Sequence, residues 1–408
     1  MLEAGPPPAG AVEEDVVTTT SRRSPHWLLP QDCRLEDLLE VLAERTQPSD
    51  YRHASRLERD VVVYDATGLD GIRDDASARR ELLAELARAL SDGPGIVVFE
   101  HAFAPDTVDR VTAVFEAMIA EQRSAGMQSG DHFGKPGAND RVWNALEKLA
   151  VADPEAFVAY YANDVVALAA TAWLGPGYQV TSQVNVVNPG GAGQTVHRDY
   201  HLGFQSDEVC ARYPSHVHAL SQVLTLQGAV AHCDMPVESG PTLYLPHSQK
   251  YAHGYVAYQR PEFQAYFVEN HVQLPLAKGD AVFFNPALFH AAGSNHSSDI
   301  RRMANLLQVS SAFGRAMETV DRQRVVEAVF PALVAVRAGG MADATVANVV
   351  AASAEGYSFP TNLDRDQPIG GLAPPSQADV VLSALADGTS AEDLHARLEA
   401  QAEARRSH

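Results

Sequence analysis

The segment 178–309 decides the fold, and it contains two motifs, TVHRDYH at positions 195–201 and KGDAVFFNPALFH at positions 278–290. Around these motifs the chain breaks into short runs of β-branched and aromatic residues, which Gly, Pro and Asn separate. Short runs with this punctuation are typical of the strands of a sandwich or a barrel. The expected strands are 180–187, 222–230, 242–245, 272–276, 281–284 and 304–309.

Helical periodicity precedes and follows this segment, so the predicted fold class is α+β, a sandwich or barrel supported by helices. No GxGxxG or GxxxxGK[ST] motif stands between a strand and a helix, which disfavours the usual nucleotide-binding loops. The expected helices are 35–45, 75–90, 105–123 and 154–174 before the strands, and 316–338, 342–355 and two within 377–406 after them.

The same pattern divides the chain into four regions. Residues 1–30 are rich in Pro, Thr, Ser and acidic side chains without a period, which predicts a flexible tail. The region 31–93 is expected to be helical or irregular, and 94–315 to form the β-rich domain. The region 316–408 is expected to be a helical C-terminal extension.

The composition argues against several classes of partner. The 408 residues include 52 acidic and 31 basic side chains, for a net charge of −21. Nucleic-acid binding requires a basic surface, so no nucleic-acid partner is expected. Only four of the basic residues are lysines, which leaves no polybasic patch for a membrane. The sequence leaves open whether the chain forms a homo-oligomer.

The cysteine count and the apolar segments predict the location of the protein. Three cysteines without a CxxC spacing do not build a disulfide scaffold, and they fit a reducing compartment. The N-terminus lacks the basic start and apolar block of a secretory signal. The longest apolar stretch, 165–174, is too short to span a bilayer. We therefore expect a cytoplasmic protein.

The two motifs together contain a candidate metal site. His197 and Asp199 are two positions apart, and such residues point to one side of an extended segment. His290 in the second motif can complete a set of two histidines and one carboxylate. This set leaves adjacent metal positions open and is the signature of non-haem Fe(II) oxygenases. An HxD spacing alone is weak evidence in a chain with 16 histidines, so the second motif matters.

A candidate cosubstrate anchor follows the second motif. Arg301 stands eleven positions after His290, on the next expected strand. A guanidinium there can form a bidentate pair with the far carboxylate of a cosubstrate that chelates the metal. Arg302 is its neighbour, and adjacent residues of a strand face opposite sides of the sheet, so only one of them points inward. The alternation of the strand does not decide between the two.

These motifs resemble the phytanoyl-CoA dioxygenase family of Fe(II)/2-oxoglutarate-dependent oxygenases. The resemblance covers about 94–315 and lies in the order and spacing of HRD at 197–199, ESGP at 238–241, KGD with FF at 278–284, and the distal His and Arg. It implies a double-stranded β-helix (a jelly-roll, cupin-like core) for this domain, with supporting N-terminal helices. The eleven-residue step of the family favours Arg301 as the partner of the 2-oxoglutarate C5 carboxylate.

The resemblance also implies the composition of the site. His197, Asp199 and His290 would be the catalytic residues that hold Fe(II), and Gln183 or Asn185 would contact 2-oxoglutarate. The expected reaction uses O2 to hydroxylate a small organic metabolite and releases succinate and CO2. Related halogenases lack the carboxylate ligand, so the presence of Asp199 favours a hydroxylase.

Two other functions stay open at the level of the sequence. A jelly-roll protein can retain a metal or bind 2-oxoglutarate without catalysing a reaction. A hydrolase or isomerase with a divalent metal on a cupin-like barrel is the second alternative, because sites of His and carboxylate accept several metals. Aerobic formation of succinate separates the oxygenase from both.

Overall fold

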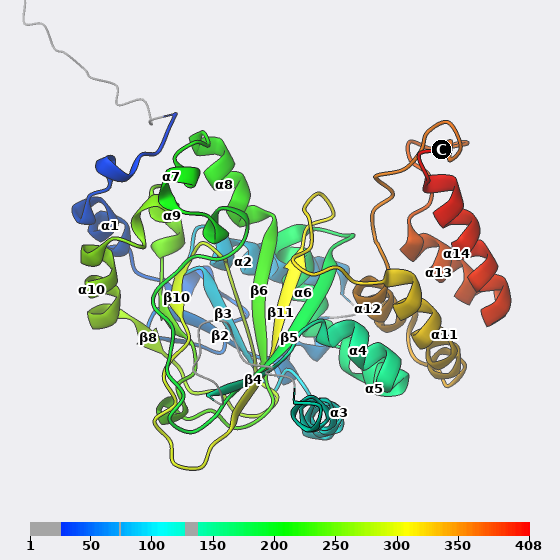
Figure 1. Cartoon of the computed structure of the whole chain (residues 1–408), viewed down its shortest axis with the longest axis horizontal. Coiled ribbons are helices and arrows are strands. Elements are labelled where there is room, and N and C mark those ends of the chain that lie inside the picture. Colours follow the sequence, from blue (N-terminus) through cyan, green and yellow to red (C-terminus); the bar gives the residue numbers. More distant parts are fainter. Residues whose placement is uncertain (1–25, 73–74, 127–137) are drawn as a thin grey trace, which may run out of the picture.

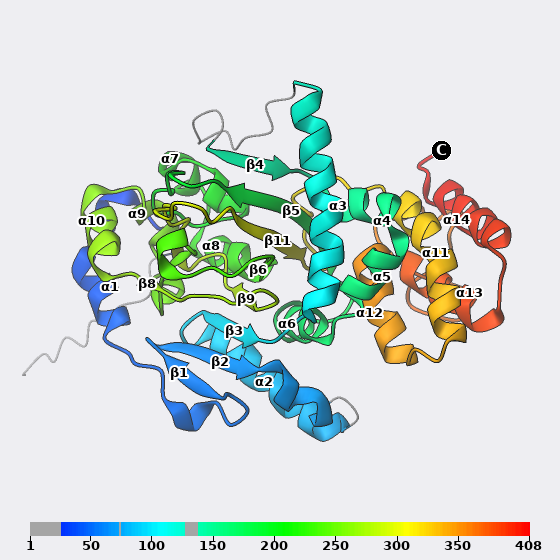
Figure 2. The same ribbon diagram turned by 90° about the horizontal axis from the view of Figure 1, so that it is seen from below.

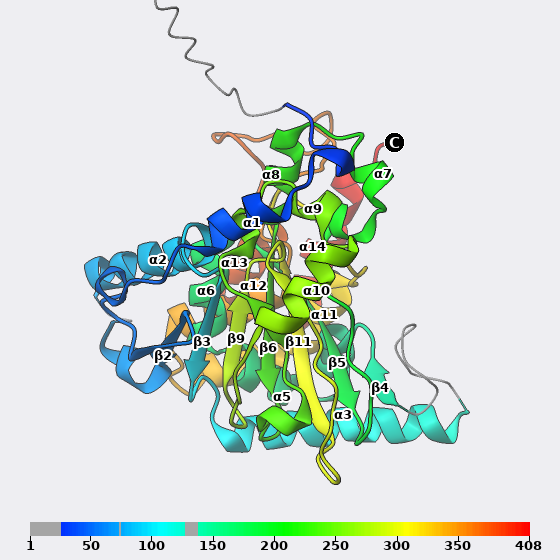
Figure 3. The ribbon, with the colours of Figure 1, turned by 90° about the vertical axis from the view of Figure 1, so that its left-hand side faces the viewer.

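The computed structural model describes residues 26–72, 75–126 and 138–408. In these residues, an eight-stranded sheet and a three-stranded sheet lie among groups of helices (Figure 1). The large sheet has the order β1–β2–β3–β9–β6–β11–β5–β4, which can be followed from β2 to β4 in Figure 3. Its strands are β1 Arg56–Glu58, β2 Val61–Asp65, β3 Ile96–Glu100, β4 Asn139–Val142, β5 Gln179–Val187, β6 Thr225–Ala231, β9 Ala281–Phe284 and β11 Arg302–Ser310.

The second sheet is small and faces the first. It has the order β10–β7–β8, formed by Phe289–Ala291, Leu243–Leu245 and Val272–Gln273. The large sheet is mixed, because β2 and β3 are parallel while its other neighbours are antiparallel. Side chains of both sheets meet in one buried apolar cluster, which includes Tyr244 of β7 and Phe284 of β9. The two sheets therefore enclose a shared interior.

The outer face of the large sheet is covered by helices. Its apolar side chains, such as Val184 of β5 and Leu307 of β11, belong to the largest buried cluster. Residues of the C-terminal helices, among them Phe330 and Val349, belong to the same cluster. Figures 1 and 2 show α11 to α14 on the side of α4 and α5, with α3 running past the edge strand β4.

The ends of several helices follow local sequence signals. Helices α3 and α5 begin with a proline in the first turn, where no amide hydrogen is needed. The Asn163 side chain accepts hydrogen bonds from the amides of Val165 and Val166 and so caps α6, which divides the expected helix 154–174 in two. The helices are α1 Leu35–Leu42, α2 Ala76–Ser91, α3 Pro105–Ser124, α4 Ala145–Ala152, α5 Pro154–Tyr161, α6 Asp164–Leu174, α7 Asp207–Cys210, α8 Ser215–Val223, α9 Gly254–Ala257, α10 Pro261–Asn270, α11 Arg322–Ala338, α12 Asp343–Ser353, α13 Gln377–Asp387 and α14 Ala391–Arg405.

The expected mixture of helices and strands is confirmed, with differences in detail. Each expected strand has a counterpart, although 222–230 begins inside α8 and only two residues of 272–276 belong to a strand. The region 31–93 contains β1 and β2, which the sequence pattern did not predict. The expected flexible tail lies outside the described residues up to position 25.

No single helix in the described ranges is both long enough and apolar enough to cross a membrane. The bent pair of α5 and α6 passes the test of length and composition as a unit, with an angle of 60° between the two helices. Six residues of α6 are buried, and most of them lie in the large apolar cluster of the fold. Burial inside the protein accounts for the apolar composition of this pair.

Candidate metal centre

The two sequence motifs are joined by main-chain hydrogen bonds. The amide of His197 donates to the carbonyl of His290 at 2.9 Å, and the amide of His290 donates back at 3.2 Å. The amide of Asp199 donates to the carbonyl of Pro286 at 3.0 Å. The HRD segment is therefore extended beside β10, and its side chains alternate in direction. His197 and Asp199 share one side, and the intervening Arg198 takes the other.

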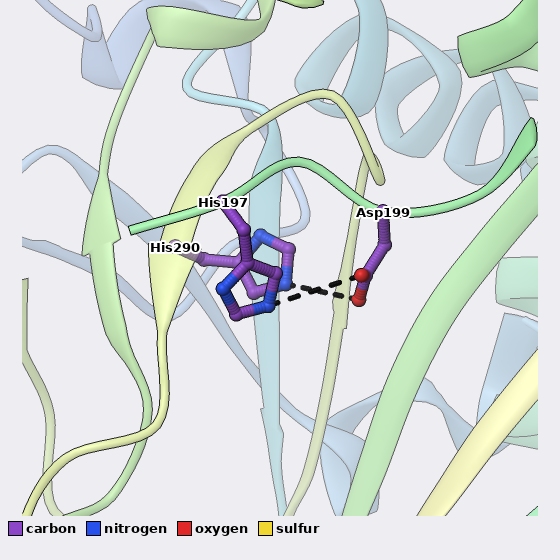
Figure 4. A group of neighbouring side chains, drawn as sticks. All are labelled: His197, Asp199 and His290. Carbon is purple, nitrogen blue, oxygen red and sulfur yellow. Dashed lines mark hydrogen bonds and ion pairs between the residues drawn. The ribbon is translucent and has the colours of Figure 1, made fainter. Parts of the chain in front are cut away.

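The two imidazole rings are oriented through their Nδ1 atoms. Nδ1 of His197 donates to the carbonyl of Thr195, and Nδ1 of His290 to that of Leu288, both at 2.8 Å. Each Nε2 faces Asp199, at 3.8 Å from Oδ1 for His197 and 3.3 Å from Oδ2 for His290 (Figure 4). Fixing the non-coordinating nitrogen in this way is typical of metal-binding histidines.

The three side chains fit one divalent metal ion. Their ligand-type atoms lie within 4.8 Å of one another. Burial on its own would raise the pKa of Asp199, but the charge of His197 and the hydrogen bonds from His290 and Gln227 lower this pKa below its usual range. Gln227 of β6 donates its amide group to Oδ2 of the carboxylate. The carboxylate is thus ionised and fixed in direction, as a cation site requires.

Arg198 links the two motifs on the side of the HRD segment opposite to His197 and Asp199. Its side chain is 2% exposed, and Nη2 donates to two main-chain carbonyls of the segment 248–251, at 2.6 and 3.1 Å. The guanidinium also lies over the rings of Tyr255 and Phe289, at 5.1 and 5.0 Å from the ring centres. Because Phe289 precedes His290 in β10, one buried side chain braces the HRD segment against the strand of the distal histidine.

Arg301, the arginine that the sequence favoured, does not lie with His197, Asp199 and His290, which we call the metal set. Its side chain is 39% exposed and pairs with Glu116 at 2.9 Å and Asp140 at 3.8 Å. Asp140 in turn binds Arg123 of α3 at 2.6 Å, so this group of charges lies on the helix-covered face. The reason is the register of β11, in which the neighbouring position faces the interior.

Arg302 takes the inward position. Its Nη1 donates to the carbonyls of Ser239 at 3.3 Å and Gly293 at 3.0 Å, and burial lowers the pKa of the guanidinium to about 10. No carboxylate of the described residues forms an ion pair with it. The ring of Tyr244, which lies opposite His290 in the small sheet, is among its neighbours. A buried cation that forms no ion pair with the residues that the structure describes therefore lies in the same interior as the metal set.

Gln183 and Asn185 also face this interior. They lie on β5 opposite Leu306 and Ala304 of β11, whose side chains border the apolar cluster between the sheets. Gln183 is 1% exposed and accepts a hydrogen bond from Arg141 at 2.9 Å. Their contact with a cosubstrate stays a prediction.

Sequence reasoning missed other polar residues of the interior. Gln227 of β6 and Gln308 of β11 lie opposite each other, and Arg141 of β4 lies opposite Asn185. The signal for the two glutamines was present, because each alternates with apolar residues in its strand. Tyr200 directly follows the HRD motif with a φ of +62°, a strained value for a residue with a side chain.

A sequence profile described as phytanoyl-CoA dioxygenase (PhyH) matches residues 91–303. The matched residues form more than half of the chain and include both motifs and both arginines. No protein of the curated set matches the chain significantly.

Several solved structures are distantly similar. The non-heme alpha ketoglutarate dependent epimerase SnoN from nogalamycin biosynthesis has a TM-score of 0.40 and 20% identity, over 58% of this chain and 82% of its own. AviO1 from Streptomyces viridochromogenes Tue57 has a TM-score of 0.40 and 20% identity, over 55% and 93%. EctD from S. alaskensis, crystallised with 2-oxoglutarate and 5-hydroxyectoine, has a TM-score of 0.42 and 18% identity, over 57% and 77%. At this distance the likeness carries no inference about substrate or reaction.

Proposed function

Because the chain belongs to the phytanoyl-CoA dioxygenase (PhyH) family of Fe(II)/2-oxoglutarate-dependent oxygenases, we propose that it hydroxylates a small organic molecule. The observation that carries the proposal is the convergence of two imidazole Nε2 atoms and one carboxylate on a common centre. Such a set leaves adjacent coordination positions open for a cosubstrate and O2. Bound iron and 2-oxoglutarate supply the oxidising power, with succinate and CO2 as coproducts, while the protein binds and orients the reactants.

In this proposal His197, Asp199 and His290 hold the iron. Because both Nδ1 atoms donate to main-chain carbonyls, the Nε2 atoms are the ring nitrogens that would bind the metal. Gln227 keeps the carboxylate turned toward the same centre. Since Asp199 fills one coordination position, a halide lacks the equivalent place, which favours hydroxylation over halogenation.

We propose Arg302, instead of Arg301, as the residue that binds the C5 carboxylate of 2-oxoglutarate. Both of its hydrogen bonds to carbonyls use Nη1, so Nη2 and Nε are available for a bidentate pair with a carboxylate. An anion there would neutralise a cation that is now desolvated without an ion pair in the described residues. Gln183 and Asn185, on the same interior face, remain candidates for further contacts to the cosubstrate.

We also propose that the two facing sheets are the halves of a double-stranded β-helix. The shared apolar cluster between them supports this assignment, as does the position of His290 on the small sheet. The proposed domain boundaries are 94–315 for the catalytic jelly-roll and 316–408 for the extension, with 31–93 before them.

The decisive experiment is an anaerobic titration of the protein with Fe(II) and 2-oxoglutarate, followed by exposure to air. We expect one iron per chain, a charge-transfer absorption band that needs both additions, and succinate after O2 is admitted. Binding of 2-oxoglutarate without any succinate would support the non-catalytic alternative. Absence of 2-oxoglutarate binding would contradict the proposal and favour a metal-dependent hydrolase or isomerase.

A further inference from the structure

Glu318 brings a carboxylate to the interior from outside the matched family residues. It lies between β11 and α11, and the family match ends at residue 303. Its Oε1 accepts a hydrogen bond from the main-chain amide of Asn144 at 2.7 Å. Its Oε2 is buried and accepts no hydrogen bond from the residues that the structure describes. One oxygen of this carboxylate thus fixes its position, and the other is left for a ligand.

Tyr200 directly follows the proposed ligand Asp199, and its side chain is buried. Its hydroxyl oxygen is buried without a hydrogen-bond partner in the described residues. The interior beside the proposed iron site thus contains a buried hydroxyl group that a ligand can satisfy.

A row of side-chain amides lies on the inner face of the large sheet. Gln227 and Gln308 lie opposite each other on neighbouring strands, and Gln183 donates to Gln308 at 3.4 Å. The sulfur of Met317 lies 3.8 Å from the Gln183 amide nitrogen, which places the residue before Glu318 against this row. The row begins at Asp199, to which Gln227 is bonded, and reaches the segment of Glu318. The row therefore links the proposed iron site to the segment of Glu318.

The position of Glu318 is fixed by contacts between α4 and the start of the C-terminal extension. Glu147 of α4 accepts hydrogen bonds from the side chain of Asn144 at 2.9 Å and from the amide of Asp321 at 3.0 Å. It also pairs with Arg324 of α11 at 3.3 Å. The same Asn144 holds Oε1 of Glu318 through its main chain. The carboxylate is therefore prepositioned and is not a mobile surface acid.

Three buried side-chain atoms without a hydrogen-bond partner on or near this row are acceptors. They are Oε2 of Glu318, Oδ1 of Asn185 and Oε1 of Gln227, each buried without a partner among the residues that the structure describes. Buried acceptors are costly unless a donor meets them. A ligand that donates hydrogen bonds can satisfy such acceptors, whereas an alkyl chain cannot.

We propose that Glu318 is a substrate-binding residue of the oxygenase site, and that the substrate is a small polar molecule that presents an ammonium or hydroxyl group to its Oε2. This inference rests on the proposed function. It deepens that function by assigning the substrate class as a donor-rich molecule and by giving the C-terminal extension a role in recognition.

The test measures O2-dependent succinate formation by the iron-loaded, full-length protein with three sets of compounds. The sets are primary amines with amino acids, neutral sugars with other polyols, and straight-chain fatty acids. We expect amines or polyols to raise the rate above that without an added compound, and fatty acids to leave it unchanged. Anaerobic binding of Fe(II) and 2-oxoglutarate by the wild type is recorded in parallel, because it reports on the proposed function alone.

Two variants separate the possible donors. Glu318→Ala should raise the apparent KM of the stimulating compound by about 10- to 100-fold, as expected for loss of a hydrogen bond to a charged group. Glu318→Gln keeps the acceptor for Asn144, so it guards against misfolding, but it removes the charge. For an ammonium substrate, the apparent KM should rise about as much with Glu318→Gln as with Glu318→Ala. For a hydroxyl substrate, the apparent KM of Glu318→Gln should stay within about threefold of the wild type. Glu269→Gln, at an exposed position of α10, is the matched control and should change nothing.

Three results would overturn the inference while the proposed function stands. In each, the wild type binds Fe(II) and 2-oxoglutarate. In the first, only fatty acids raise the rate; in the second, none of the three sets does. In the third, Glu318→Ala leaves the KM of an active amine or polyol unchanged. A wild type that binds neither iron nor 2-oxoglutarate refutes the proposed function, and this inference with it.

Discussion

The two faces of the large sheet use neighbouring residues for different purposes. On β11, Leu307 points to the helices and belongs to the largest apolar cluster, while Gln308 points to the interior that holds the metal set. On β5, Val184 and Gln183 are divided in the same way. Stability and chemistry are thus separated by one step along a strand. Substitutions of adjacent residues should therefore have different consequences.

The buried polar side chains on the inner face of the large sheet are tolerated because most of them have hydrogen-bond partners. Gln183 both accepts from Arg141 and donates to Gln308, and Gln227 donates to the carboxylate of Asp199. Burying such groups without partners would cost free energy that the apolar face would have to offset. On this face, the buried acceptors without a partner in the described residues include Oδ1 of Asn185 and Oε1 of Gln227, which a ligand can satisfy.

The largest effect is expected in the interior between the two sheets, at the metal set. His290→Ala removes one of the two proposed imidazole ligands but keeps the main-chain hydrogen bonds that join the motifs. Iron binding in the presence of 2-oxoglutarate should be lost, and succinate formation should fall to the level of the metal-free protein. Circular dichroism should remain like that of the wild type.

The control for this experiment is His216→Ala, because His216 is exposed on α8. It should retain the iron content and the activity of the wild type. Substantial succinate formation by His290→Ala would remove this histidine from the proposed ligands.

On the helix-covered face of the large sheet we expect the opposite pattern, a loss of stability without a loss of cosubstrate binding. Phe330 of α11 is 1% exposed within the large cluster, so Phe330→Ala should lower the free energy of unfolding by about 3–5 kcal/mol. Denaturation by urea measures this, and 2-oxoglutarate affinity at low temperature should stay unchanged. Val334→Ala, at an exposed position of the same helix, should cost less than about 0.5 kcal/mol. Equal destabilisation by both would mean that α11 does not pack on the core as described.

The sequence was sufficient to predict the features that depend on local pattern. The HRD segment needs only an extended backbone for His197 and Asp199 to share a side, and the structure brings both to His290. Helices such as α2 and α3 have amphipathic repeats with caps or an initial proline, so they were predicted nearly to their ends.

The features that the sequence could not predict depend on tertiary pairing. Strand β2 is buried on both faces, so its VVVYD run shows no alternation. The choice between the two arginines depends on where β11 begins pairing with β5, which the local pattern leaves undecided. Glu318 lies in no recognisable motif, and its proposed place at the site depends on the contacts of its segment with α4 and α11.

A third prediction tests the inward arginine. Arg302→Ala removes the buried guanidinium that we propose as the partner of the C5 carboxylate. Loss of charge-assisted hydrogen bonds should weaken 2-oxoglutarate binding by about 10- to 100-fold. The affinity is measured by anaerobic titration at saturating Fe(II), and iron binding without the cosubstrate should be retained. An unchanged 2-oxoglutarate affinity would exclude Arg302 as the anchor.

The smallest effect is expected one residue earlier, at Arg301. This side chain pairs with Glu116 on the helix-covered face, and both partners are more than a third exposed, so solvent screens the pair. Arg301→Ala should therefore change the free energy of unfolding by only about 0–1 kcal/mol. Its 2-oxoglutarate affinity should stay within about twofold of the wild type, because the guanidinium lies across the sheet from the metal set. If Arg301→Ala instead loses the cosubstrate and Arg302→Ala does not, β11 is shifted by one residue. Every assignment to its inner face, Gln308 included, would then move to the other face.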